Sequence, residues 1–198
     1  MVQSAIDIKS WQACIPSVRE VRPRCCPCCN APSEEIGARV RLHGHGVRER
    51  QLRGPLASTE PPTESTVLAR RYRCTDCGAV VVVVPRGVAY RRLFTAPAIV
   101  LALCLWAVEE QPARKARGAV SPHRHIGAVA GWGWTSLVRW ARDAARGRIV
   151  RKTRPVARDG DPRAVARRVV LAVAAFAPPG LREATLREQV FAGAALAA

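Results

Sequence analysis

Apolar and polar residues alternate in two different ways along this chain, and the pattern changes near Arg92. Before that residue, short apolar stretches of period two are separated by Gly and Pro, which is typical of β-strands. A stretch with three prolines and several Ser, Thr and Glu residues predicts an exposed loop at 54–65. The pattern predicts strands at 38–42, 47–52, 67–74 and 79–84. This part of the chain is therefore expected to form a small β-rich module.

After that point the apolar positions follow the period of an α-helix. Thr95 is a candidate N-cap for a long apolar helix that ends before Pro112. Asp161 followed by Pro162 is a second cap, with proline in the first turn where it is tolerated. Helices are predicted at 95–108, 112–118, 135–147, 161–177 and 181–196.

Two Cys-x-x-Cys pairs are the strongest chemical signal in the sequence. Cys26 and Cys29 form one pair, and Cys74 and Cys77 form the other. Two such pairs supply the four thiolates of a tetrahedral site, so the sequence predicts a structural zinc ion. Gly78 follows the second pair, where a tight turn often needs a positive φ. Four protein ligands leave no open position, so this metal is expected to stabilise the fold and to perform no chemistry.

Other ligand sets remain open at this point. Cys25 and Cys28 are also two residues apart and could replace the first pair. His43 and His45 are further alternative ligands, although such histidines are more often solvated. A hairpin and the exposed loop can fill the 44 residues between the two pairs, so the pairs are expected at the tips of two hairpins, as in a zinc ribbon.

These patterns together predict an α+β chain, in which a small β-rich zinc ribbon precedes an all-α helix-turn-helix-like bundle. The C-terminal helices are expected to pack on the helical unit, and pairing of two copies through them stays open. The expected segments are a leader of uncertain order at 1–24, the zinc-ribbon module at 25–92, the helical unit at 93–147, a basic linker at 148–160 and C-terminal helices at 161–198.

Charge narrows the class of partner. The chain has 32 Lys and Arg residues against 15 Asp and Glu, a formal charge of +17, which favours a polyanion as the partner.

The N-terminal stretch includes Asp7 and Lys9 and no apolar core of signal-peptide length, so a cytoplasmic protein with reduced thiols is expected. The apolar runs fall short of the ~20 residues that a bilayer requires, so no membrane partner is expected.

The helix predicted at 135–147 separates apolar from basic residues. Leu137, Trp140, Ala141 and Ala144 recur at helical spacing and form one face. Arginines on another face suit the DNA major groove, where they reach phosphates or guanine, and the helix N-terminus can receive a phosphate. The predicted nucleic-acid contacts are Arg114, Lys115 and Arg117 on the preceding helix, and Ser136, Arg139, Arg142 and Arg146 on this one.

The second cysteine pair and its surroundings resemble a known family. The run Arg71-Tyr72-Arg73-Cys74-Thr75-Asp76-Cys77-Gly78, followed by a β segment, Pro85, an arginine pair and a Leu/Ala-rich helix, is similar to the zinc-ribbon plus helix-turn-helix front end of insertion-sequence transposases. Ser136-Leu137-Val138-Arg139-Trp140 is similar to the start of their recognition helix. The resemblance covers residues 25–146 and implies a unit that binds double-stranded DNA.

Two departures limit what the resemblance implies. After residue 146 the only acidic residues are Asp159, Asp161, Glu183 and Glu188, too few for the ribonuclease-H-like catalytic domain of a transposase. About 14 residues, 121–134, separate the second and third helices, where a standard turn takes three or four.

The leading hypothesis is a non-catalytic, zinc-stabilised DNA-binding protein, either related to a mobile element or a small regulator. The alternative is a zinc-ribbon protein that binds RNA or a protein partner through Trp132 and Trp134. We expect no enzyme, because the sequence shows no activated nucleophile, phosphate-cradling glycine loop or paired carboxylates.

Overall fold

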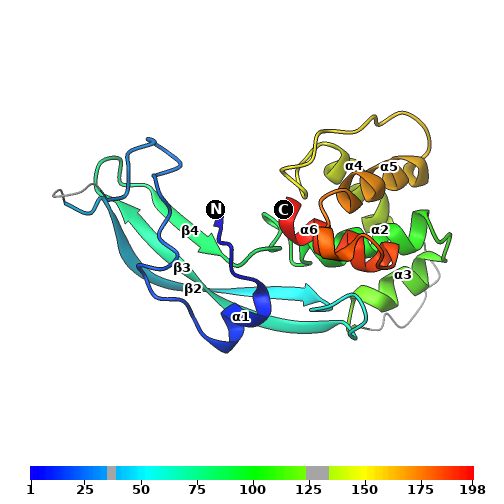
Figure 1. Cartoon of the computed structure of the whole chain (residues 1–198), viewed down its shortest axis with the longest axis horizontal. Coiled ribbons are helices and arrows are strands. Elements are labelled where there is room, and N and C mark those ends of the chain that lie inside the picture. The colour runs from blue at the N-terminus through cyan, green and yellow to red at the C-terminus, as the bar shows by residue number, and fades with distance from the viewer. Residues whose placement is uncertain (35–38, 124–133) are drawn as a thin grey trace. The chain divides into compact units, whose positions relative to one another are not determined.

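The computed structural model of this chain describes residues 1–34, 39–123 and 134–198. Within these residues the fold is mixed α+β, with one four-stranded sheet and six α-helices. The chain forms two compact units (Figure 1). The first consists of Met1–Gln51 with Thr66–Arg86, and the second of Leu52–Ser65 with Gly87–Ala198. Each unit is therefore assembled from two separate stretches of chain.

The sheet has the strand order β1-β4-β3-β2. Its strands are β1 (Val2–Gln3), β2 (Leu42–Gly54), β3 (Thr63–Cys74) and β4 (Val80–Val84). β3 and β4 pair antiparallel, with Tyr72 opposite Val81, and β1 pairs parallel to β4. Both long strands, β2 and β3, contribute residues to both units.

β2 is one strand where the sequence predicts two. The predicted strand 47–52 lies within β2, but of the predicted strand 38–42 only Leu42 belongs to it: residues 39–41 are not in a strand, and residue 38 lies outside the described residues. Gly46 has a φ of +79°, a conformation that glycine adopts at little steric cost. The glycines that suggested a break therefore lie within a continuous strand.

Residues 1–24, for which the sequence predicts a leader of uncertain order, form part of the first unit. Helix α1 (Ile8–Ala13) starts at Asp7, whose side chain accepts a hydrogen bond from the backbone N–H of Ser10. Trp11 on this helix is fully buried, and its indole N–H donates to the carbonyl of Leu68 at 3.0 Å. A large buried aromatic with a satisfied N–H ties this segment to β3.

The second unit is organised around α2 (Ala96–Ala107), which is buried along nearly its whole length and packs against α3, α4, α5 and α6. As predicted, Thr95 caps α2 by accepting from the N–H of Ala98, and Asp161 caps α5 by accepting from two N–H groups. None of the described helices is long and apolar enough to cross a bilayer. The helices around α2 are α3 (Ala113–Val120), α4 (Thr135–Ala145), α5 (Pro162–Ala174) and α6 (Leu186–Ala197).

The last helix starts later than the sequence predicts. Residues 179–181 form a short 3-10 turn, and α6 begins only after Thr185. Thr185 and Glu188 form a reciprocal capping box, which satisfies two N–H groups at the helix start. α6 then packs closely on α5, since a Cβ placed on Gly193 would lie 2.2 Å from the carbonyl oxygen of Val173.

Candidate metal centre and arginine-bearing helix

The two cysteine pairs sit on turns with the same hydrogen-bond pattern. In the first turn, the N–H of Asn30 donates to the carbonyl of Cys26 at 2.8 Å. In the second, the N–H of Gly78 donates to the carbonyl of Cys74 at 3.0 Å. The backbone N–H of Cys26 donates to the carbonyl of Ala31 at 2.8 Å, and that of Cys74 donates to the carbonyl of Ala79 at 3.0 Å. The two turns are therefore local copies of one structure.

The fourth residue after each first cysteine is left-handed. Gly78 has a φ of +70° and Asn30 a φ of +58°. Glycine adopts this region freely, and asparagine tolerates it better than most residues. The rule of a cysteine pair followed by Gly or Asn selects Cys26 and Cys29, because Cys28 is followed by another cysteine. The sequence carries this signal after both pairs.

The turns bring the sulfur atoms of Cys26, Cys29, Cys74 and Cys77 within 4.8 Å of one another. The Sγ atoms of Cys26 and Cys77 are 3.7 Å apart, and those of Cys29 and Cys74 are 3.8 Å apart. A tetrahedral zinc site with Zn–S bonds of about 2.3 Å has S···S distances of about 3.8 Å. This cluster could therefore hold a metal ion.

The neighbouring cysteines and histidines lie outside this group. Cys25 and Cys28 are exposed free thiols, whereas Cys26 is buried. His43 and His45 are exposed on β2. None of these four belongs to the described cluster, so it has the composition that the favoured spacing predicts.

The protein environment prepares one thiol of the cluster for deprotonation. The backbone N–H of Cys29 lowers the pKa of Cys26 to about 7. For Cys77, the backbone N–H of Ala79 also lowers the pKa, but burial and the surrounding thiols outweigh it and raise the pKa to about 12. A divalent cation that binds all four sulfurs must therefore displace protons, which makes its affinity fall at low pH.

Helix α4 separates buried apolar residues from exposed arginines, as predicted. Leu137, Trp140, Ala141 and Ala144 are all buried. On the same helix and at its C-cap, the exposed residues include three arginines, which we call the α4 arginine row: Arg139, Arg142 and Arg146.

The start of α4, where the sequence predicts a phosphate contact, has no side-chain cap. Residue Trp134 occupies the N-cap and forms no side-chain capping bond. Ser136 is half-buried, and its hydroxyl accepts a hydrogen bond from the guanidinium of Arg139 at 3.5 Å. The Ser136 hydroxyl therefore already has a partner on its own helix.

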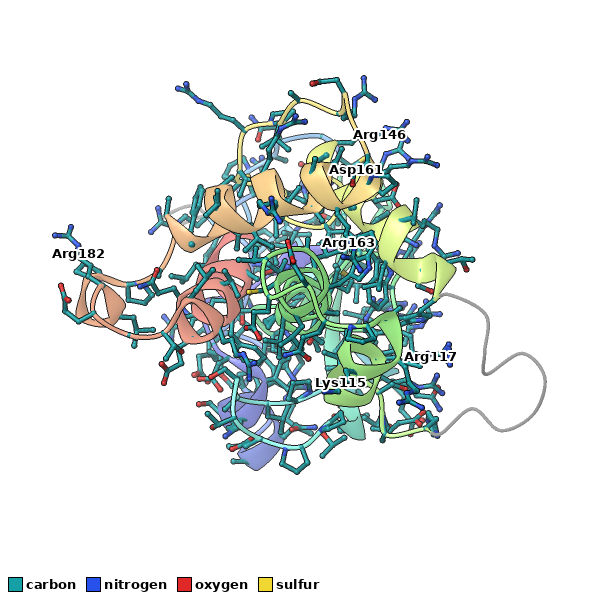
Figure 2. All side chains as sticks on the ribbon, turned by 90° about the vertical axis from the view of Figure 1, so that its right-hand side faces the viewer. Lys115, Arg117, Arg146, Asp161, Arg163 and Arg182 are labelled. Atoms are coloured by element: carbon teal, nitrogen blue, oxygen red, sulfur yellow. The ribbon has the colours of Figure 1, made fainter. Side chains whose placement is uncertain are left out.

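The predicted contacts on α3 divide into two groups. Arg114 and Lys115 are exposed, and Figure 2 shows Lys115 at the surface of this unit. Arg117 is half-buried, and its guanidinium lies over the ring of Trp134, 5.8 Å from the centroid. Trp134 also makes an edge contact with Trp140, at a centroid distance of 4.7 Å. Of the connector 121–134, residues 124–133 lie outside the described residues, and Trp132 is among them.

The pattern of the sequence does not predict two further features, the ion pairs of Asp143 and the cation–π contacts of Tyr90. Asp143 is buried on α4 and pairs with Arg92 and Arg148, so two guanidinium groups compensate its charge. Tyr90 is 42% exposed and has guanidinium groups over its ring from Arg91, at 5.2 Å, and Arg151, at 5.7 Å. Both depend on residues that are distant in sequence, so periodicity could not reveal them.

Comparison with protein-family models, with curated proteins and with solved structures finds no match for this chain.

Proposed function

We propose that this chain is a zinc-stabilised, non-catalytic protein that binds double-stranded DNA through the α4 arginine row. The observation that supports it is the division of α4 into a fully packed apolar face and an exposed row of Arg139, Arg142 and Arg146. An amphipathic helix held rigidly by its apolar face can present such a row to phosphates and base edges. The formal charge of +17 draws the protein to the polyanion.

Zinc is the metal that best suits the cysteine cluster. Four thiolates at tetrahedral spacing favour Zn²⁺ over the hard cations, which prefer oxygen ligands. With four protein ligands and no open position, the ion holds the two cysteine turns together and activates no water. Reduced thiols are needed for this role, which fits a cytoplasmic protein.

The charges around α4 support DNA binding through this helix. The acidic residue on this helix, Asp143, is neutralised by Arg92 and Arg148 and does not offset the row. The resemblance to the DNA-binding front end of insertion-sequence transposases points the same way, with a role in a mobile element or in regulation. The alternative of RNA or protein binding through Trp134 loses support, because this ring packs between Trp140, Phe94 and Arg117.

The salt dependence of duplex binding tests the proposal. We expect the logarithm of the affinity to fall linearly with the logarithm of the salt concentration, since arginines displace counterions. Arg142→Ala should weaken binding and reduce the slope by about one, the value for one lost phosphate contact. The measurement is fluorescence anisotropy of a labelled duplex at several salt concentrations.

Arg182→Ala is the matched control, because Arg182 is exposed in the same unit and lies apart from Arg146 in Figure 2. It removes the same charge and should leave the slope nearly unchanged. An equal loss in both variants would show that the net charge binds DNA and that α4 has no special role. No duplex binding at low salt would reject the proposal.

A further inference from the structure

The second unit contains a cavity, whereas the cysteine cluster belongs to the first unit. The volume of the cavity is about 270 Å³, and its walls combine two arginines, a hydroxyl, an imidazole and two aromatic rings. The lining residues are Arg53, Phe94, Arg117, Ser121, His123 and Trp134. This set comes from the end of β2, the segment before α2, the end of α3 and the N-cap of α4.

The two arginines are fixed in place by the protein. Arg53 pairs through its backbone with the segment before α2: its N–H donates to Leu93 at 2.8 Å, and its carbonyl accepts from Thr95 at 3.0 Å. Its guanidinium donates to one oxygen of Glu64 at 3.3 Å. Arg117 is held differently, with its guanidinium over the ring of Trp134. Each guanidinium therefore has a contact within the second unit that orients it.

Both arginines retain a donor without an acceptor. Among the described residues, the Nε atoms of Arg53 and Arg117 are buried and have no hydrogen-bond partner. A buried guanidinium N–H that lacks an acceptor is costly, and an anion that enters the cavity would remove that cost. The neighbouring residues add further polar groups, since the hydroxyl of Ser121 and the imidazole of His123 line the same space.

Glu64 orients these groups and does not cancel them. One of its oxygens contacts Arg53, and the other lies 2.6 Å from Nε2 of His123. The hydrogen bond from His123 and the contacts of Arg53 lower the pKa of Glu64, so this carboxyl stays ionised. Two fixed guanidinium groups against one carboxylate leave the cavity positive.

We propose that this cavity binds a phosphate group. Guanidinium groups match the geometry of phosphate oxygens, and a phosphate can accept from two arginines, a hydroxyl and an imidazole together. The aromatic walls lower the local dielectric and so strengthen these charge-assisted bonds. The phosphate comes either from the end of a nucleic-acid strand or from a free phosphate ester, and both present the same terminal group.

Binding of inorganic phosphate to the whole chain tests the proposal directly. Isothermal titration at constant ionic strength should show saturable binding, and Arg117→Gln should weaken it about tenfold or more, the loss expected for a charged hydrogen bond. Arg114→Gln is the matched control: Arg114 is exposed on the same helix and carries the same charge. It should change the affinity less than about twofold.

A second variant distinguishes a loss of phosphate binding from a folding defect. His123 is about half exposed, and His123→Ala should weaken phosphate binding while the circular dichroism spectrum and melting temperature stay as in the wild type. Arg117→Lys should restore only part of the affinity, because an ammonium group keeps the charge and loses the guanidinium geometry. Equal effects of Arg114→Gln and Arg117→Gln, or no saturable binding, would overturn the proposal.

Two arms identify the source of the phosphate. A duplex with a 5′-phosphate should bind more tightly than the same duplex with a 5′-hydroxyl if strand ends are the source, and Arg117→Gln should abolish that preference. Equal binding of both duplexes, together with saturable binding of a nucleoside monophosphate, assigns the cavity to a free ester. Arg142→Ala should leave phosphate binding intact in either case, so this proposal can fail or succeed independently of the α4 arginine row.

Discussion

Asn30 and Gly78 occupy equivalent positions in the two cysteine turns, and both have positive φ. A β-branched residue in this left-handed region costs about 1–2 kcal/mol, because its Cβ approaches the following carbonyl oxygen. The cysteine spacing therefore needs a compatible residue after each pair. The geometry of the turn, as much as the thiols, determines which cysteines can converge.

Asn30→Val tests this requirement. We expect a loss of about 1–2 kcal/mol in the free energy of unfolding and a weaker metal affinity, because the first turn must bend without a tolerant residue. The measurement is urea unfolding combined with competition against a zinc chelator. Asn30→Gly is the control and should retain or slightly increase stability. Equal behaviour of the two variants would show that the backbone conformation at this position is unimportant.

At the scale of elements, α5 and α6 approach each other at a glycine. A Cβ on Gly193 would meet the backbone of Val173, which cannot move away as the end of a flexible side chain can. Gly118 on α3 offers the opposite environment, since nothing lies within 4 Å of a Cβ placed there. The same substitution therefore has opposite expected effects on two helices of one unit.

Gly193→Ala should destabilise the chain by roughly 1–3 kcal/mol through overpacking. Gly118→Ala should stabilise it by up to about 1 kcal/mol, because alanine has the higher helix propensity. Thermal and urea unfolding, monitored by the helical circular dichroism signal, measure both. A neutral Gly193→Ala would mean that α5 and α6 separate without cost.

An ion pair links the end of α2 to α6. The guanidinium of Arg187 donates to Glu109 at 2.6 Å, and this hydrogen bond lowers the pKa of Glu109 below its usual 4.5. A carboxyl with a lower pKa in the folded state contributes stability above its unfolded pKa, and this contribution is lost as the pH falls through the folded pKa. Because the pair is partly exposed, its contribution is between about 0.2 and 1 kcal/mol.

Glu109→Gln should therefore lower stability at neutral pH and make it fall less steeply between about pH 5 and pH 3. The measurement is the free energy of unfolding at a series of pH values for wild type and variant. Glu183→Gln, at an exposed residue of the same unit, is the control and should keep the wild-type pH profile. Parallel profiles for wild type and Glu109→Gln would contradict the role of the pair.

The elements divide into those that local chemistry determines and those that distant contacts determine. The starts of α2 and α5 could be predicted, because Thr95 and Asp161 bond to N–H groups within three residues of themselves. The burial of Trp11 could not, since its partner Leu68 lies 57 residues away. Spacing predicted the cysteine cluster but left Cys25 and Cys28 as alternative ligands, whereas the phosphate cavity joins Arg53 to Arg117 and gave no pattern in the sequence.

At the scale of the whole molecule, a metal ion on the cysteine cluster and the helical core would stabilise different units. The cysteine cluster belongs to the first unit, and the large buried core around α2 belongs to the second. Structural zinc contributes about 10–16 kcal/mol of apparent binding free energy, comparable to the stability of an entire domain. The first unit should therefore depend on the ion far more than the second.

Removal of the metal should unfold the first unit selectively. With a strong chelator, amide hydrogen exchange should accelerate in residues 66–74 and 80–84, while α2 keeps its protection; added zinc should restore the slow exchange. Cys29→Ser should reproduce the chelator effect, and Cys28→Ser should not, because its thiol lies outside the cluster. Unchanged exchange on chelation would show that the cluster stabilises nothing.

β2 and β3 each contribute residues to both units, which limits how the chain can be divided into fragments. Neither unit is a contiguous stretch, so no single cut or recombination point yields one of them intact. A fragment that starts near residue 92 retains α2 to α6 and loses Arg53 and Glu64, which belong to the phosphate cavity and its support. Neither unit can therefore be produced as one contiguous fragment of this chain, and transfer of either one into another protein would require both of its stretches.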